Sequence, residues 1–181
     1  MQAVIAQHQD PMEWLEPIYR EHSKAVIQTA YRVTGNAEDA EDVLQTVFTR
    51  LARRSDPPDL SGGALPYLRR AATNAALDIV QSKRVKTSVA FDGVGEATTS
   101  DPAPRPDSIF QGREAHRILR QAVAKLSRRS AEVFTLRYFE DMDNKAIAAA
   151  LDTSPGTVAV TLHRVREKLK AEMAPLMGGN R

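Results

Sequence analysis

The polar residues of this sequence fall into groups whose types and spacing suit binding better than catalysis. One acidic group, with no cation among its members, comes just before an apolar stripe of helical spacing over residues 43–51. It consists of Glu38, Asp39, Glu41 and Asp42. Carboxylates at a helix start interact favourably with the helix dipole. The group is therefore either an ordinary helix N-terminus or a surface that binds another protein, and the residues alone leave both interpretations open.

A second polar group is basic and contains an amide. Arg70, Asn74 and Asp78 recur at intervals of four residues and therefore share one face of a predicted helix. Arginine can hold phosphates while an asparagine amide contacts a base edge, which is a common division of roles in nucleic-acid sites. A solvated helix surface is the alternative interpretation of Asn74.

The third polar group surrounds the apolar stripe of the last predicted helix, at Val158, Leu162, Val165 and Leu169. Because this stripe is expected to be buried, the residues around it face outward. Small residues near the helix start allow close approach to a DNA groove, and basic residues further along are placed to meet phosphates. The outward candidates are Thr157, Val160, Thr161, His163, Arg164, Arg166 and Lys168.

The sequence predicts neither a catalytic centre nor a metal site. Asp39 and Asp42 are spaced like a carboxylate pair, but no histidine, serine or glycine-rich phosphate loop converges with them in the sequence. Cysteine is absent, which excludes disulfides and thiolate zinc sites, and His163 has no partner at ligand spacing. We therefore expect a protein that is not an enzyme and needs no metal or cofactor.

Composition and charge agree with a nucleic-acid-binding protein of the cytoplasm. The 181 residues are 42% hydrophobic and carry a net charge of only +2, but residues 112–181 hold 13 basic against 8 acidic side chains. Such a basic segment suits a polyanion partner. No apolar run reaches the roughly 18 residues of a membrane helix, and residues 1–10 lack the pattern of a signal peptide, so no membrane insertion is expected.

These groups must be positioned by helices, because apolar residues recur at helical spacing and strand signals are missing. We predict an all-α fold of two small helical domains joined by a flexible linker. The first domain, residues 1–86, contains a helix ending near Gly35 and Asn36, a helix over about residues 38–53 and another over about residues 65–83. Prolines at 102, 104 and 106 oppose a helix in the linker, residues 87–108. A long surface loop inside one domain is the alternative.

The second domain, residues 109–181, is predicted to have four helices that include a helix-turn-helix. Ser127 is placed to cap one helix and Asp143 to cap another, which runs over residues 144–151. After a short turn Ser154 caps the last helix, and Pro155 occupies its first turn. This order is typical of a recognition helix, with an ordinary bundle of basic surface as the alternative.

Three segments, taken in order, carry a family resemblance. Residues 35–48 are GNAEDAEDVLQTVF, residues 67–78 are YLRRAATNAALD, and residues 126–166 contain SRRSAEVFTLRY and GTVAVTLHRVR. Together they resemble the extracytoplasmic-function (ECF) sigma factors, small two-domain initiation factors of bacterial RNA polymerase. The resemblance extends over roughly residues 18–169.

The resemblance implies a role for each segment. The first would dock on the clamp helices of the largest polymerase subunit through Asp39, Glu41, Asp42 and Gln45. The second would hold the melted nontemplate strand of the minus-ten element, with one flipped base in a pocket lined by Asn74. The minus-ten candidates are Tyr67, Arg69, Arg70, Asn74, Lys83 and Arg84. The third would contact the duplex minus-thirty-five element through the outward residues of the last helix.

The implied function is that of a sigma factor. It would bind core polymerase, recognise promoter DNA at two elements, help to melt the upstream edge of the bubble and so direct initiation. Members of the family are commonly held by an anti-sigma protein between the domains, and a tether over residues 87–108 suits such a partner, although no residue identifies it. The alternative is a free-standing helix-turn-helix regulator, which needs no acidic docking helix.

Overall fold

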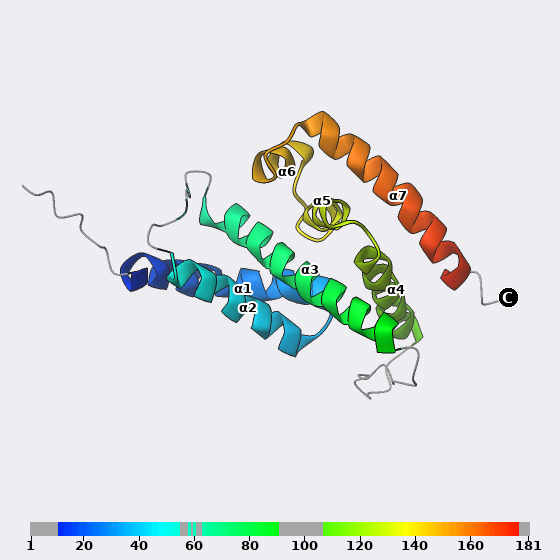
Figure 1. Cartoon of the computed structure of the whole chain (residues 1–181), viewed down its shortest axis with the longest axis horizontal. Helices are drawn as coiled ribbons and strands as arrows, with labels where there is room; N and C mark the ends of the chain where they lie inside the picture. The colour runs from blue at the N-terminus through cyan, green and yellow to red at the C-terminus, as the bar shows by residue number, and fades with distance from the viewer. Residues whose placement is uncertain (1–10, 55–57, 59, 61–62, 91–106, 178–181) are drawn as a thin grey trace, which may run out of the picture.

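The computed structural model describes residues 11–54, 58, 60, 63–90 and 107–177 (Figure 1). Within these ranges the chain forms seven helices and no strand, which confirms the all-α prediction. In order they are α1 (Pro11–Thr34), α2 (Ala37–Ala52), α3 (Ala64–Ala90), α4 (Asp107–Ala124), α5 (Arg128–Tyr138), α6 (Asn144–Ala150) and α7 (Pro155–Met177). None of the described helices is long and apolar enough to cross a membrane.

Helices α1, α2 and α3 pack together as the first half of the molecule. The predicted stripe of α2 is buried at Val43, Val47, Phe48 and Leu51. The turn before α2 is also as expected, because Gly35 has a φ of +68° and the side chain of Asn36 accepts a hydrogen bond from the Asp39 amide at 2.9 Å. A side chain at position 35 would be strained and would collide with the guanidinium of Arg120 in α4.

Helix α3 is longer than predicted. It was expected to end near Lys83, but it continues to Ala90 and so takes up the first residues of the expected linker. Helix α4 begins at Asp107, also inside the expected linker. Residues 91–106, on which the rest of that prediction falls, lie outside the described part of the chain.

The second half contains the predicted helix-turn-helix, formed by α6 and α7. Asp143 caps α6 through a 2.7 Å hydrogen bond from the Ala146 amide, and Ser154 caps α7 by accepting from the Thr157 amide at 3.1 Å. Ser127 does stand at the N-cap of α5, but its hydroxyl contacts that of Ser130 at 2.9 Å rather than a backbone amide. Ser127 therefore occupies the predicted N-cap position without making a side-chain cap hydrogen bond.

The two halves pack directly against each other, with α5 between α3 and α6 (Figure 1). Ala131 and Phe134 of α5 belong to one apolar cluster with residues of α1, α2 and α3. Val133 and Leu136, on another face of the same helix, belong to a second cluster with α6 and α7. The two predicted helical domains are thus in direct contact through α5, which contributes to both apolar clusters.

We expect Leu136→Ala to lower the free energy of unfolding by about 2–5 kcal/mol, because a fully buried leucine leaves a cavity. Val160→Ala is the control, since Val160 is 52% exposed and its truncation should change stability by less than about 0.5 kcal/mol. Urea unfolding followed by circular dichroism measures both values. Equal effects of the two substitutions would contradict this core assignment.

Candidate functional site

The acidic group at the start of α2 divides into an exposed face and one buried member. Glu41, Asp42 and Gln45 are exposed on the outer side of the helix, and the buried stripe faces the other way. These three predicted polymerase contacts therefore share one accessible surface, which we call the acidic face. Glu38 is also exposed there, although it was not among the candidates.

Asp39 is not part of the acidic face. It is only 9% exposed, and its carboxylate oxygens lie 2.6 and 2.8 Å from Nζ of Lys83 on α3. The sequence assigned these two residues to different partners, polymerase and DNA, but the fold pairs them with each other. The ion pair of Asp39 and Lys83 therefore joins the first turn of α2 to the C-terminal part of α3.

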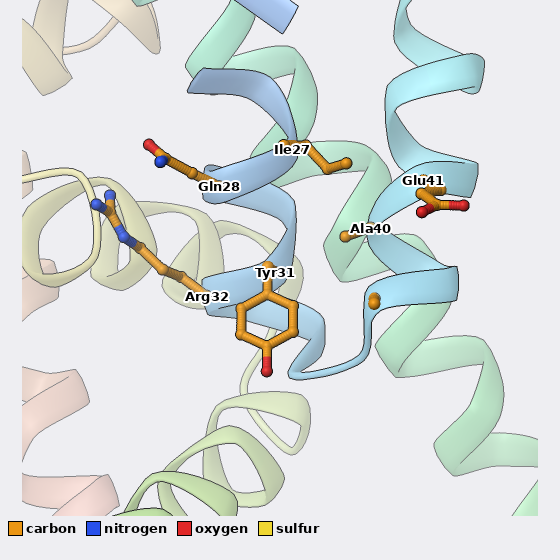
Figure 2. A pocket seen from close by; sticks show the side chains of 7 residues that line it. Ile27, Gln28, Tyr31, Arg32, Ala40 and Glu41 are labelled. Atoms are coloured by element: carbon orange, nitrogen blue, oxygen red, sulfur yellow. The ribbon is translucent and has the colours of Figure 1, made fainter. Parts of the chain in front are cut away.

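A groove of about 420 Å³ runs between α1 and α2 beside the acidic face (Figure 2). It is lined mainly by apolar groups, among them Ile27, Tyr31 and Ala40, with Glu41 at its edge. Tyr31 is 54% exposed. Figure 2 shows Arg32 extending from α1 away from α2, and its guanidinium donates to the Phe139 carbonyl at 2.8 Å.

Two of the three arginines predicted to hold the minus-ten strand, Arg69 and Arg70, are paired with carboxylates of the second half. Nε of Arg69 lies 3.1 Å from Oε2 of Glu140, without the alignment of a hydrogen bond, so this contact is ionic. The other oxygen of Glu140 lies 3.2 Å from Nη1 of Arg32. Nε of Arg70 lies 3.5 Å from Oε1 of Glu132 on α5. Two acidic side chains thus pair with two of the three arginines of α3.

The same face of α3 is covered further along by the start of α5. The backbone carbonyl of Asn74 accepts from Nη2 of Arg128 at 2.9 Å, and Arg128 also pairs with Asp78. The side-chain Oδ1 of Asn74 is buried and has no hydrogen-bond partner among the described residues. Arg84, another minus-ten candidate, donates to the Ala124 carbonyl at 3.3 Å.

Tyr67, another minus-ten candidate, is partly buried and packs against the first apolar cluster. It shares a packed pocket with Trp14, Leu51, Pro58 and Leu60. The family resemblance also implies that the loop over residues 55–65 contributes to the base pocket, but most of this loop, positions 55–57, 59 and 61–62, lies outside the described residues.

Helix α7 presents the predicted duplex-contacting surface. Val158, Leu162, Val165 and Leu169 are all buried, as expected. The hydroxyl of Thr161 donates to the Thr157 carbonyl at 2.8 Å, so it is partly used within the helix. The exposed candidates are Thr157, Val160, His163, Arg164, Arg166 and Lys168.

Comparison with known proteins identifies the family. The model of sigma-70 region 2 matches residues 18–85, and the model of sigma-70 region 4 matches residues 116–169. The RNA polymerase sigma-E factor of Streptomyces coelicolor is 30% identical over 159 residues, which cover 87% of this chain and 85% of that protein. This chain belongs to the ECF sigma factors of bacterial RNA polymerase.

Further similarities support the assignment. The ECF sigma factor SigW of Bacillus subtilis is 26% identical over 93% of this chain and 91% of its own length. The ECF sigma factor SigE of Mycolicibacterium smegmatis is 28% identical, and the match spans 61% of that protein. The sigma factor RpoE of Bartonella quintana, solved in complex with the anti-sigma factor NepR, has the same fold with a TM-score of 0.56 at 15% identity, over 94% of this chain and 99% of that one. As a sigma factor, the chain binds core polymerase and promoter DNA and directs transcription initiation.

Among the described residues two groups have shifted pKa values, one in α4 and one paired with the turn that follows α4. A hydrogen bond and the positive charge of Lys125 lower the pKa of Glu172, and this contact joins α7 to the turn after α4. Burial lowers the pKa of Arg120, the side chain beside Gly35. Among the described residues no cluster of acidic or histidine side chains has the geometry of a metal site.

Sequence reasoning missed the residues that join the two sigma regions. These are Arg32, Arg128, Glu132 and Glu140. Glu132 carried one usable signal, because a carboxylate inside the apolar run of α5 needs a charged partner when it is buried. One partner is local, because Nη1 of Arg129 on the same helix lies 3.5 Å from Oε2 of Glu132. The second partner, Arg70, depends on how the two halves dock.

We expect Asp39 and Lys83 to be energetically coupled in stability measurements. In a double-mutant cycle with Asp39→Asn and Lys83→Met the coupling energy should be about 0.5–1 kcal/mol, since the Lys83 side chain is 61% exposed and solvent screens the pair. The matched cycle with Lys86→Met, an exposed lysine of the same helix, should give about zero. Equal coupling in both cycles would show that the observed pair is not specific.

Proposed function

We propose that this sigma factor docks on the clamp helices of the largest polymerase subunit through the acidic face of α2. Support comes from the accessibility of Glu41, Asp42 and Gln45 on a helix whose other side is held in the core. The adjoining apolar groove with exposed Tyr31 extends this surface. Asp39 contributes indirectly, because its pair with Lys83 holds the start of α2 against α3.

We propose that α3 binds the melted nontemplate strand of the minus-ten element. Arg69, Arg70 and Arg84 supply cations for phosphates, and the buried Oδ1 of Asn74 is an acceptor that has no partner among the described residues. An amide of this kind can contact a flipped base and repay the few kcal/mol that unstacking costs. Lys83 contributes a further positive charge to strand binding while it remains paired with Asp39. Tyr67 packs against the first apolar cluster and so supports α3 from the core side.

We propose that α7 contacts the duplex minus-thirty-five element. The exposed positions near its start are small or apolar, so Thr157 and Val160 can approach base edges and thymine methyl groups. Thr161 and His163 flank them, and Arg164, Arg166 and Lys168 are placed for phosphates. Recognition of DNA shape would supply the remaining selectivity.

The chain in this proposal acts in the cytoplasm, catalyses no reaction itself and needs no cofactor, because the polymerase supplies the chemistry. It helps to melt the upstream edge of the transcription bubble. An anti-sigma factor is a further proposed partner, since a structural neighbour, RpoE of Bartonella quintana, was solved with NepR.

The docking proposal is tested by Asp42→Arg combined with Gln45→Ala. Reversing a charge at the interface should weaken association with core polymerase by about 3 kcal/mol, roughly 100-fold, and abolish run-off transcription. Glu21→Arg, the same charge reversal at an exposed position of α1, is the control. Co-purification with core polymerase measures association, and wild-type association of the double variant would refute the docking surface.

The duplex proposal is tested by Arg164→Ala on a promoter fragment that run-off transcription of a genomic library identifies. Loss of one phosphate contact should reduce the slope of log affinity against log salt by about 0.9. Arg53→Ala, an exposed arginine at the end of α2, should leave the slope unchanged. If Arg164→Ala leaves both affinity and slope at wild-type values, α7 does not hold the duplex through this residue.

A further inference from the structure

The turn between α6 and α7 is held by a side chain from a different helix. Nη2 of Arg129, in the first turn of α5, donates to the backbone carbonyl of Leu151 at 2.7 Å. We infer that Arg129 is a positioning residue, which holds this turn and the start of α7 in the geometry that binds the minus-thirty-five duplex. This inference rests on the proposed role of α7, and its test separates the two.

The carbonyl of Leu151 lies where the backbone offers it little. A helical partner would come from the amide four residues on, but that residue is Pro155, which has no N–H. The amide of Thr153 instead bonds the earlier carbonyl of Ala148 at 2.9 Å, and so closes the end of α6. The side chain of Arg129 therefore supplies the hydrogen bond that the carbonyl of Leu151 would otherwise take from the backbone.

The turn also contains a residue in an unfavourable backbone conformation. Asp152, directly after Leu151, has a φ of +48°, in the left-handed region that costs free energy for a residue with a side chain. Its amide makes only a long bond of 3.5 Å to the Ala149 carbonyl. A hydrogen bond from a charged donor is stronger than one between neutral groups, so Arg129 offsets part of the cost of this conformation.

Glu132 fixes the direction of the guanidinium group. Nη1 of Arg129 lies 3.5 Å from Oε2 of Glu132 one turn along the same helix, while Nη2 reaches Leu151. The side chain of Glu132 is only 8% exposed, so this carboxylate has a defined place although Arg129 itself is 47% exposed. Only an arginine offers two donors in one rigid plane to two separate acceptors.

The position of the turn decides where the start of α7 lies. The side chain of Leu151 is buried in one apolar cluster with Val158 of α7, so its carbonyl is attached to the residue that anchors the turn in the core. The far end of α7 is held separately, because Lys125 pairs with Glu172 at 2.7 Å. The helix has 23 residues and is about 35 Å long, so a small rotation at the turn displaces Thr157 relative to a DNA groove.

Arg129→Met tests the positioning role in the full chain. Loss of a hydrogen bond from a charged donor should weaken binding of the promoter duplex that run-off transcription identifies by about tenfold, as measured by fluorescence anisotropy of the labelled duplex. The slope of log affinity against log salt should keep its wild-type value, because Arg129 holds no phosphate in this role. Adding Asp152→Gly should restore most of the affinity, since glycine adopts a positive φ without strain.

Two further variants complete the experiment. Arg128→Met is the matched control, because it removes the same charge from the same turn of α5 but breaks a pair with Asp78 of α3, and it should bind the duplex with wild-type affinity. Arg129→Lys keeps the charge and loses the planar fork, and it should weaken binding by about threefold. This milder substitution gives the answer even if Arg129→Met does not fold.

Wild-type affinity of both Arg129 variants would overturn the inference. An equal loss in Arg128→Met would also overturn it, because any positive charge at the start of α5 would then have the same effect. A salt slope lowered by about 0.9 without rescue by Asp152→Gly would identify Arg129 as a phosphate contact instead. Arg164→Ala separates these results from the proposed function, because a lowered slope in that variant keeps α7 as the duplex surface even when the inference fails.

Discussion

Burial of α5 on two faces is the constraint on which the arrangement of the molecule depends. Phe134 packs with the first three helices while Leu136 packs with α6 and α7. A helix with apolar residues on both faces cannot leave either core without exposing side chains to water. The helix-turn-helix is therefore placed relative to α3 by the same element that completes its own core.

Ion pairs between the two halves then determine which charged side chains remain exposed when the halves pack together. The contact of α3 with α5 and the residues just after it uses two arginines that we propose for DNA, so Arg69 and Arg70 face carboxylates of their own chain. The acidic face of α2 and the outer face of α7 carry exposed charges in the same structure. In this structure the surfaces that we propose for polymerase docking and duplex contact are exposed, while part of the surface that we propose for the melted strand is covered.

The elements of the fold were largely predictable from the sequence. Helical spacing placed the buried faces of α2 and α7, and Gly35, Asp143 and Ser154 marked helix ends through local hydrogen bonds or a positive φ. The end of α3 was predicted too early, because its last turns lack an apolar stripe and carry no stop signal before Ala90. A helical period of apolar residues indicates a helix face that packs against a core. A helix end that does not pack in this way shows little of that period, so its last residue is hard to predict.

The candidate residues and their chemistry were likewise set by the sequence, through the acidic group at the start of α2, the amide and arginines of α3 and the capped last helix. Only the tertiary structure decided which of them are available. Asp39 and Lys83 are 44 positions apart, and Arg32 and Glu140 are 108 apart, yet each pair forms one contact. Local sequence encodes helix periodicity and caps, because these depend on neighbours within a few positions, whereas ion pairing across helices depends on how separate cores dock.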